Sequence, residues 1–234
     1  MLKRFHDIRL NMLTRVGRAI MPDGYWHNDE DGEEASCHLT FDDGPHPHTT
    51  PELLKLLEAE HIKATFFLTG TNSRRYPELV KRIAEAGHEL GNHSFNHLPA
   101  PLLTCSKMEQ EIDQTNRVIE EVCGQTPRLF RPPYGIMDRK GSDCLKEREM
   151  LCIYWGALAE DWDPIGHHEI VRRIEHQSRN GSLIVLHESA RHPEQSIRSA
   201  RGVIEKLKRK GLSFDTILKP KKATRDEGAA PPYS

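Results

Sequence analysis

Short apolar runs alternate with helical patterns along most of this sequence, and that alternation is its most constraining feature. Seven runs of apolar or β-branched residues are typical of buried strands, at residues 37–41, 64–68, 89–91, 129–131, 151–155, 183–186 and 214–217. Amphipathic helical patterns lie between them, at residues 51–59, 77–86, 107–122, 141–148, 169–178 and 195–209. Strands that alternate with helices predict parallel βαβ units. Periodicity by itself leaves both an open doubly wound sheet and a closed barrel.

Size and charge exclude several classes of protein. The 234 residues suit one domain, or two small ones, with enough chain for a sizeable core. The 33 basic and 35 acidic residues nearly balance, so nucleic acid is not predicted as the main partner. The five cysteines are scattered, odd in number and without a Cys-x-x-Cys pair, which argues against a disulfide framework or a zinc knuckle. No apolar run reaches the ~18 residues of a spanning helix.

The two ends of the chain differ from its middle. We predict an amphipathic segment and acidic connector at residues 1–36, one α/β domain at 37–218, and a flexible tail at 219–234. The apolar face of residues 1–20 is interrupted by arginine, so this helix either packs on the domain or touches an anionic membrane surface. Residues 1–20 lack the continuous apolar block of a secretion signal. We therefore expect a cytoplasmic protein, with peripheral contact to the inner membrane face as the variant.

Polar side chains follow most of the predicted strands. In parallel α/β folds, the carboxyl ends of the strands share one edge, where active sites form. Each group alone is ordinary: an Asp-Asp-Gly turn is common, and about one His pair at i, i+4 is expected by chance among 14 His. Together they predict one site from five strand ends, which carry Asp42-Asp43, His93 and His97, Arg131 and Tyr134, Asp161 and Trp162, and His187.

These residue types suit metal-assisted hydrolysis. His93 and His97, interpreted as one helical turn apart, can join one carboxylate of the Asp pair around an ion. Three protein ligands with an open position are the catalytic form of a zinc site. The second carboxylate is then a general base, kept ionised by Arg131. His187 can protonate the leaving group, with Asp161 holding its orientation and charge.

Five segments, in this order, resemble the motifs of the polysaccharide deacetylases, the NodB-homology domain of carbohydrate esterase family 4. They read Thr-Phe-Asp-Asp-Gly, His-Ser-Phe-Asn-His, Arg-Pro-Pro-Tyr, Glu-Asp-Trp and Leu-Ile-Val-Leu-His. The resemblance covers about residues 37–218 and implies a distorted (β/α) barrel of about seven parallel strands. It also implies hydrolysis of the acetamido group of an N-acetylated amino sugar, in a poly-, oligo- or lipid-linked saccharide, with release of acetate and a free amine.

The resemblance also implies a role for each matching residue. Asp43, His93 and His97 would bind one divalent ion, zinc first, with Co²⁺, Ni²⁺ or Mn²⁺ as alternatives. The catalytic residues it implies are the base Asp42 with Arg131, and the acid His187 with Asp161. The amide of Tyr134 would bind the oxyanion, and Trp162 would line the substrate groove.

Alternatives remain open at the level of the sequence. Leu158 stands where the fourth motif often has an Asp, so its effect on the partnership of Asp161 with His187 is undecided. Ester hydrolysis of O-acetyl groups, or removal of formyl from a saccharide, would use the same metal chemistry. A carbohydrate-binding barrel without turnover is the alternative of another class, although such a protein should have lost Asp42 or a metal ligand. The partner expected for the leading interpretation is a carbohydrate that carries N-acetyl groups.

Overall fold

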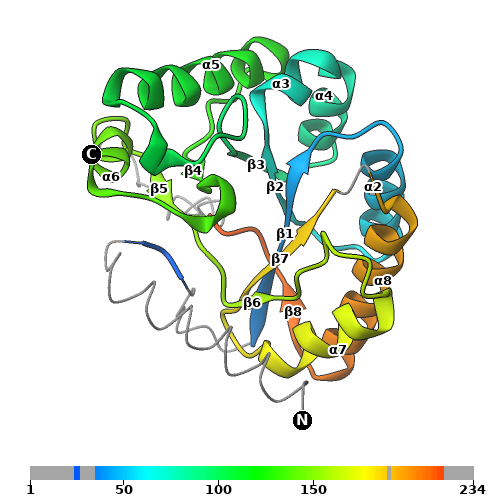
Figure 1. Cartoon of the computed structure of the whole chain (residues 1–234). Helices are drawn as coiled ribbons and strands as arrows, with labels where there is room; N and C mark the ends of the chain where they lie inside the picture. Colours follow the sequence, from blue (N-terminus) through cyan, green and yellow to red (C-terminus); the bar gives the residue numbers. More distant parts are fainter. Residues whose placement is uncertain (1–23, 27–34, 189–190, 219–234) are drawn as a thin grey trace, which may run out of the picture.

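One parallel sheet organises the molecule (Figure 1). The computed structural model describes residues 24–26, 35–188 and 191–218, so the predictions for residues 1–20 and 219–234 lie outside the described residues. The strands run in the order β5-β4-β3-β2-β1-β7-β6, and β8 also pairs with β1. Their bounds are β1 Ser36–Gly44, β2 Thr65–Leu68, β3 Glu89–Asn92, β4 Leu129–Phe130, β5 Leu151–Cys152, β6 Ala157–Leu158, β7 Leu183–His187 and β8 Ser213–Phe214.

The sheet curls into a half-barrel with helices outside it. Within the described part of the chain, no ladder joins β5 to β6 and closes the barrel. The helices are α2 Thr49–Ala59, α3 Gly70–Arg75, α4 Pro77–Glu85, α5 Cys105–Cys123, α6 Arg139–Lys146, α7 His167–Gln177 and α8 Pro193–Arg209, with 3-10 turns at Ala100–Leu102 and Pro133–Gly135. None of these described helices combines the length and apolarity that crossing a bilayer requires.

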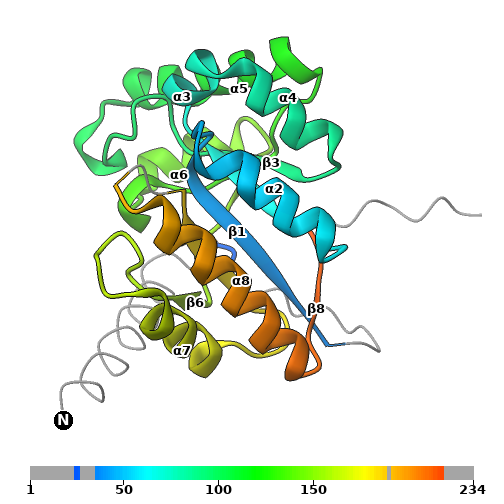
Figure 2. The same cartoon turned by 90° about the vertical axis from the view of Figure 1, so that its right-hand side faces the viewer.

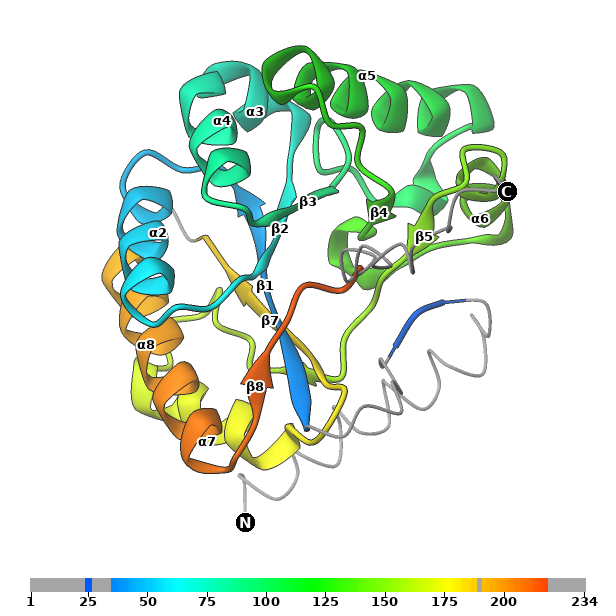
Figure 3. The ribbon, with the colours of Figure 1, turned by 180° about the vertical axis from the view of Figure 1, so that it is seen from behind.

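The central strand β1 is buried because elements cover it on every side. It pairs with β2, β7 and β8, and α2 and α8 lie along it (Figure 2). The back view shows β8 beside the start of β1 (Figure 3). Phe41 of β1 packs in one core cluster with Phe66 of β2, Leu57 of α2 and Ile204 of α8. This core fixes the strand whose end carries the two adjacent carboxylates.

The register of the sheet brings distant polar residues to one edge. Asp42 of β1 pairs with His187 of β7, and Asn92 of β3, which precedes His93, pairs with Phe130 of β4. Since every ladder is parallel, all of these strands end at the same edge. The distorted parallel (β/α) barrel predicted from the resemblance is confirmed.

Two local predictions need correction. The run at 151–155 contains only the short strand β5, and a further strand, β6, precedes Asp161, so His187 ends the seventh strand and not the sixth. The connector predicted over residues 22–36 was interpreted as a loop, but it includes a packed segment: Tyr25 forms a parallel bridge with Ile153, and Trp26 stacks on Tyr154 with ring centroids 4.2 Å apart. Two-residue strands and isolated bridges are too short for hydrophobic periodicity to reveal.

Candidate active site

A cavity of about 400 Å³ opens at the carboxyl edge of the sheet. It gathers residues from six strand ends, namely Asp42, Asp43, His93, His97, Arg131, Pro132, Tyr134, Gly135, Trp155, Leu158, Trp162, Val185 and His187. Eight of the nine site residues predicted from the sequence line it. The ninth, Asp161, is buried with 1% of its surface exposed and lies against His187. The structure therefore brings the whole predicted set together.

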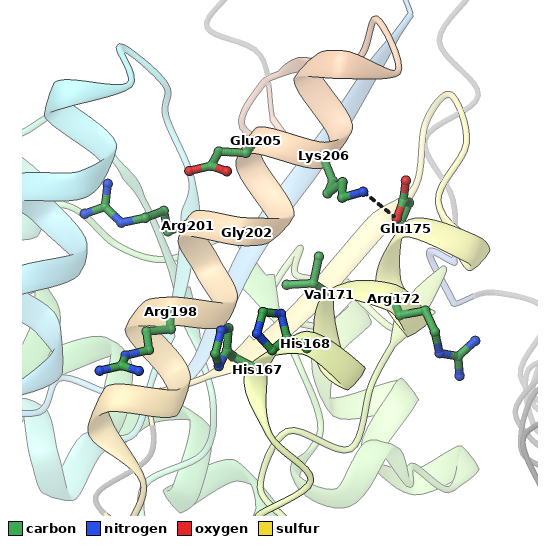
Figure 4. A pocket seen from close by; sticks show the side chains of 10 residues that line it. All are labelled: His167, His168, Val171, Arg172, Glu175, Arg198, Arg201, Gly202, Glu205 and Lys206. Atoms are coloured by element: carbon green, nitrogen blue, oxygen red, sulfur yellow. Dashed lines mark ion pairs between the residues drawn. The ribbon is translucent and has the colours of Figure 1, made fainter.

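A second hollow, of about 490 Å³, lies on the outer surface between α7 and α8 (Figure 4). None of the predicted site residues lines it. Figure 4 shows Arg172 and Arg201 extending away from each other, and Lys206 pairing with Glu175 at 3.7 Å. These are the features of a solvated helix surface, so the chemistry is assigned to the cavity at the strand ends.

Asp43, His93 and His97 present their ligand atoms to a common point. Their three ligand atoms all lie within 4.8 Å of one another. Oδ1 of Asp43 lies 3.4 Å from Nε2 of His93 and 3.2 Å from Nε2 of His97. Ligands about 2.1 Å from a tetrahedral zinc ion stand roughly 3.4 Å apart. The described residues therefore fit one small divalent ion.

The charge states of these groups also suit a metal. Burial opposes ionisation of Asp43, but the hydrogen bond and charge of His93, with His187 and His97, hold the pKa of its carboxyl well below the ordinary range. Burial, and then the neighbouring His93, lower the pKa of His97. Ligation needs an ionised carboxylate and neutral imidazoles, and both shifts are in that direction.

The two histidines are not one helical turn apart, as the sequence analysis interpreted them. The segment after β3 is a loop in which Ser94 and His97 adopt left-handed φ values of 65° and 55°. Nδ1 of His93 lies 2.8 Å from the carbonyl oxygen of Arg131 and donates to it, which leaves Nε2 directed at Asp43. The spacing of four residues was informative, but the geometry behind it is a turn.

A buried cation, Arg131, holds the carboxylate of Asp42. Nη1 of Arg131 donates to Oδ1 of Asp42 at 2.7 Å and to the hydroxyl of Thr40 at 2.6 Å. Nη2 donates to the carbonyl of Tyr154 at 2.9 Å, and the guanidinium lies 4.1 Å from the ring centroid of Phe67. The backbone of Asp43 is left-handed, with φ of 71°. Adjacent carboxylates thereby face different partners, which separates a ligand from a base.

His187 is held at the end of β7, in register with Asp42 of β1. Its Nδ1 lies 2.8 Å from Oδ1 of Asp161, and its backbone N–H donates to Oδ2 of the same carboxylate at 2.7 Å. Trp162 packs edge-on against the imidazole, with centroids 5.2 Å apart. Burial disfavours the charged ring, but Asp161, with Asp42 and Asp43, raises the pKa of His187 to about 9. Asp161 keeps this partnership although position 158 is Leu.

The loop after β4 forms the cavity rim. Tyr134 has a left-handed φ of 59° and is 63% exposed, with its ring 4.8 Å from that of His97. Gly135 allows a close approach, because a Cβ there would lie 2.1 Å from the ring of Trp155. In the described part of the chain the Tyr134 N–H has no backbone acceptor.

Several residues that shape the site were not found from the sequence. Leu158 and Val185 form a small apolar wall with Trp155. Thr40 lies two residues before Asp42 on β1, so the alternation of strand side chains could have indicated it. Two buried carboxylates behind the loops, Glu111 and Glu188, carry no signal in a single sequence because their partners come from other elements.

Comparison with known proteins gives the family. The family model described as polysaccharide deacetylase matches residues 29–151. A peptidoglycan-N-acetylglucosamine deacetylase of Bacillus cereus is 32% identical over 208 residues, covering 88% of this chain and 96% of that protein. A chitooligosaccharide deacetylase of Bradyrhizobium is 31% identical over 194 residues, covering 78% of this chain and 89% of that protein.

A solved structure gives the same answer for the fold. A crystal structure of a peptidoglycan N-acetylglucosamine deacetylase bound to a naphthalenyl N-oxidanyl-benzamide superposes with a TM-score of 0.80 at 30% identity, over 83% of this chain and 91% of that one. The family match, the two relatives and the shared fold agree with the resemblance seen in the motifs. This chain therefore belongs to the polysaccharide deacetylase family, carbohydrate esterase family 4, and is an amide-cleaving hydrolase of saccharides.

Proposed function

We propose that this protein uses one divalent metal ion to hydrolyse the acetamido group of an N-acetylated amino sugar, releasing acetate and a free amine. The observation that carries the proposal is the cluster of Asp43, His93 and His97, which shares one cavity with Asp42 and His187. The carboxylate of Asp42 and the imidazole of His187 line the same cavity as the cluster and are the base and acid that amide cleavage needs.

Asp43, His93 and His97 would hold the ion, and a donor set of two imidazoles and one carboxylate favours zinc over Co²⁺, Ni²⁺ or Mn²⁺. When bound, the ion polarises the amide carbonyl and acidifies water. The hydrogen bond from His93 to the Arg131 carbonyl fixes which imidazole nitrogen is available. The protein thus provides the site in a preformed state.

Asp42 is the proposed general base. Arg131 occupies its Oδ1, so Oδ2 is left to accept the proton of the attacking water. The guanidinium of Arg131 is the buried counter-ion of this carboxylate, at 2.7 Å. Because Arg131 is itself held by Thr40 and Tyr154, the direction of the carboxylate is set by three elements of the fold.

His187 is the proposed general acid. The Nδ1–H of His187 donates to Asp161, which leaves Nε2 of His187 for the cavity. An amine departs readily only when protonated, and His187 delivers that proton to the sugar nitrogen. The Tyr134 N–H would donate to the developing oxyanion, and Trp162, 46% exposed beside His187, would line the saccharide groove.

N-acetylglucosamine in a polymer or oligomer is the proposed substrate unit. The support is that two relatives are named for deacetylating peptidoglycan N-acetylglucosamine and chitooligosaccharide. A lipid-linked or soluble precursor stays within the proposal, since the groove recognises the sugar and the acetamido group.

A mass-spectrometric screen tests this function. Chitooligosaccharides, peptidoglycan fragments, lipid-linked N-acetylated sugars and O-acetylated xylan are incubated with zinc-loaded protein, with the Asp42→Asn variant as the control. A loss of 42 mass units from N-acetylated sugars, absent in the control, is the expected result. Loss only from O-acetyl esters would make the protein an esterase, and binding without mass change on any substrate would make it a carbohydrate-binding barrel.

A further inference from the structure

The loop that carries the two histidines is held in an unusual shape. Ser94 and His97 both have a left-handed backbone conformation, which residues other than glycine rarely adopt. Such residues persist only where surrounding contacts over-determine them. The contacts that force this loop into place therefore also determine the separation of His93 from His97.

One set of contacts comes from the start of α3. The N–H of Gly70 donates to the carbonyl of Ser94 at 3.0 Å, and the N–H of Thr71 donates to the carbonyl of Phe95 at 3.0 Å. Gly70 is required there, because a Cβ would lie 2.1 Å from the ring of Phe95. These bonds satisfy two carbonyls of the loop, and Oδ1 of Asn92 accepts from the backbone N–H of Ser94 at 2.8 Å. The hydroxyl of Ser94 and the N–H groups of Asn96 are the donors that face α5.

Glu111 of α5 satisfies those donors. Its Oε2 accepts from the hydroxyl of Ser94 at 2.9 Å and from the backbone N–H of Asn96 at 2.6 Å, and its Oε1 accepts from Nδ2 of Asn96 at 2.7 Å. Glu111 is fully buried, and Lys107, one turn earlier, lies 3.1 Å from Oε1. A carboxylate only accepts hydrogen bonds. No neutral side chain of this size can accept all three hydrogen bonds from Ser94 and Asn96.

We infer that Glu111 is a positioning residue that sets the metal affinity of the site, by fixing the loop between His93 and His97. It touches neither the ion nor the substrate. It acts through Ser94 and Asn96, the two loop residues that lie between the ligands and bond to it. The inference rests on the proposed metal-dependent function. It adds Glu111 of α5 to Asp43 as a second carboxylate that the metal site needs.

The test compares zinc dissociation constants, measured by chelator competition, for the wild type, Glu111→Gln and Asn96→Ala. The Gln variant keeps one acceptor but sets an NH₂ against one of the two Asn96 donors, so zinc binding should weaken by about 10–100-fold, the usual effect of losing an outer partner of a metal ligand. Asn96→Ala removes the bond to Oε1 of Glu111 and a long bond of 3.5 Å from the Thr71 hydroxyl, but it keeps the backbone N–H that donates to Oε2, so a smaller loss is expected. Glu109→Gln is the matched control, since Glu109 lies on the same helix near Arg148 and Cys144.

Two further readouts separate positioning from simple stabilisation. At saturating zinc, Glu111→Gln should regain a near wild-type kcat, and its cobalt-substituted form should show an altered visible spectrum. A lowered melting temperature of the metal-free protein with an unchanged zinc dissociation constant would overturn the inference. Failure of the wild type to bind zinc in a 1:1 ratio would instead overturn the proposed function, and the inference with it.

Discussion

The buried pair of Asp42 and Arg131 makes Asp42→Asn a test of both stability and chemistry. The two side chains are only 4% and 3% exposed, and Nη1 and Oδ1 are 2.7 Å apart. At an effective dielectric constant of ~20, unit charges 4 Å apart interact by about 4 kcal/mol. Asn keeps an acceptor for Arg131 but removes the charge, so the guanidinium stays buried without a counter-ion, at a cost of about 3–5 kcal/mol.

That cost has a measurable size in a thermal melt. One kcal/mol shifts the midpoint of a domain of this length by roughly 2–4 °C, so Asp42→Asn should melt about 6–20 °C lower. Differential scanning calorimetry of the metal-free protein measures it. Turnover, assayed well below the lowered midpoint, should fall about 10²–10⁴-fold because Asn accepts no proton. Bound zinc should be unchanged, since Asp42 is not a ligand.

Asp113→Asn is the matched control. Asp113 also pairs with an arginine, Arg148, at 2.6 and 2.8 Å, but its side chain is 50% exposed. Exposed pairs contribute about 1 kcal/mol or less, so this variant should melt within a few degrees of the wild type. Equal midpoints for Asp42→Asn and Asp113→Asn would refute the energetic reasoning, and near-normal turnover of Asp42→Asn would show that another group is the base.

The remaining predictions concern the acid, its partner and the N-terminal segment. His187→Ala should cripple amide hydrolysis but spare an activated aryl acetate, whose leaving group needs little protonation; equal losses in the two rate assays would mean that His187 donates no proton. In chelator-treated protein, an NMR titration should place the pKa of His187 at about 9. The charged imidazole then stabilises the fold fully at a pH below the ordinary pKa of histidine, and this stabilisation is lost as the pH rises through 9. Asp161→Asn should lower this pKa by roughly 1–3 units, and an unchanged titration would contradict the pairing. Deleting residues 1–20 should change membrane partitioning in cell fractions without altering activity on a soluble sugar; a mature protein found outside the membrane and cleaved in this segment would contradict a cytoplasmic location.

The sequence predicted those parts of the fold that local patterns encode. The long apolar runs around β1 and β7 and the amphipathic helices α5 and α8 were located within a few residues, because hydrophobic periodicity responds to burial of one face. The two-residue strand β6 was missed. The bridge of Tyr25 to Ile153 was missed as well, because such pairing depends on contacts far along the chain.

The same division holds for the site. Its residue types and their places at strand ends were predictable, because parallel strands share one edge. The distinction between Asp42 and Asp43 came only from the resemblance to the family; in the structure it depends on Arg131, 89 residues away from Asp42. The loop of His93 and His97 was interpreted as helical because spacing alone does not report a left-handed backbone. Its hydrogen-bond partners are the start of α3, Glu111 of α5 and the side chain of Asn92.

The central claim is that one metal ion, held by Asp43, His93 and His97, is needed for acetate release. The most direct measurement adds zinc stepwise to chelator-stripped protein and follows acetate released from a chitooligosaccharide. The account predicts no release without metal, a linear rise, and a plateau at about one equivalent, with the rise abolished in His93→Ala. Full activity in the stripped protein, or an unchanged plateau in His93→Ala, would contradict it.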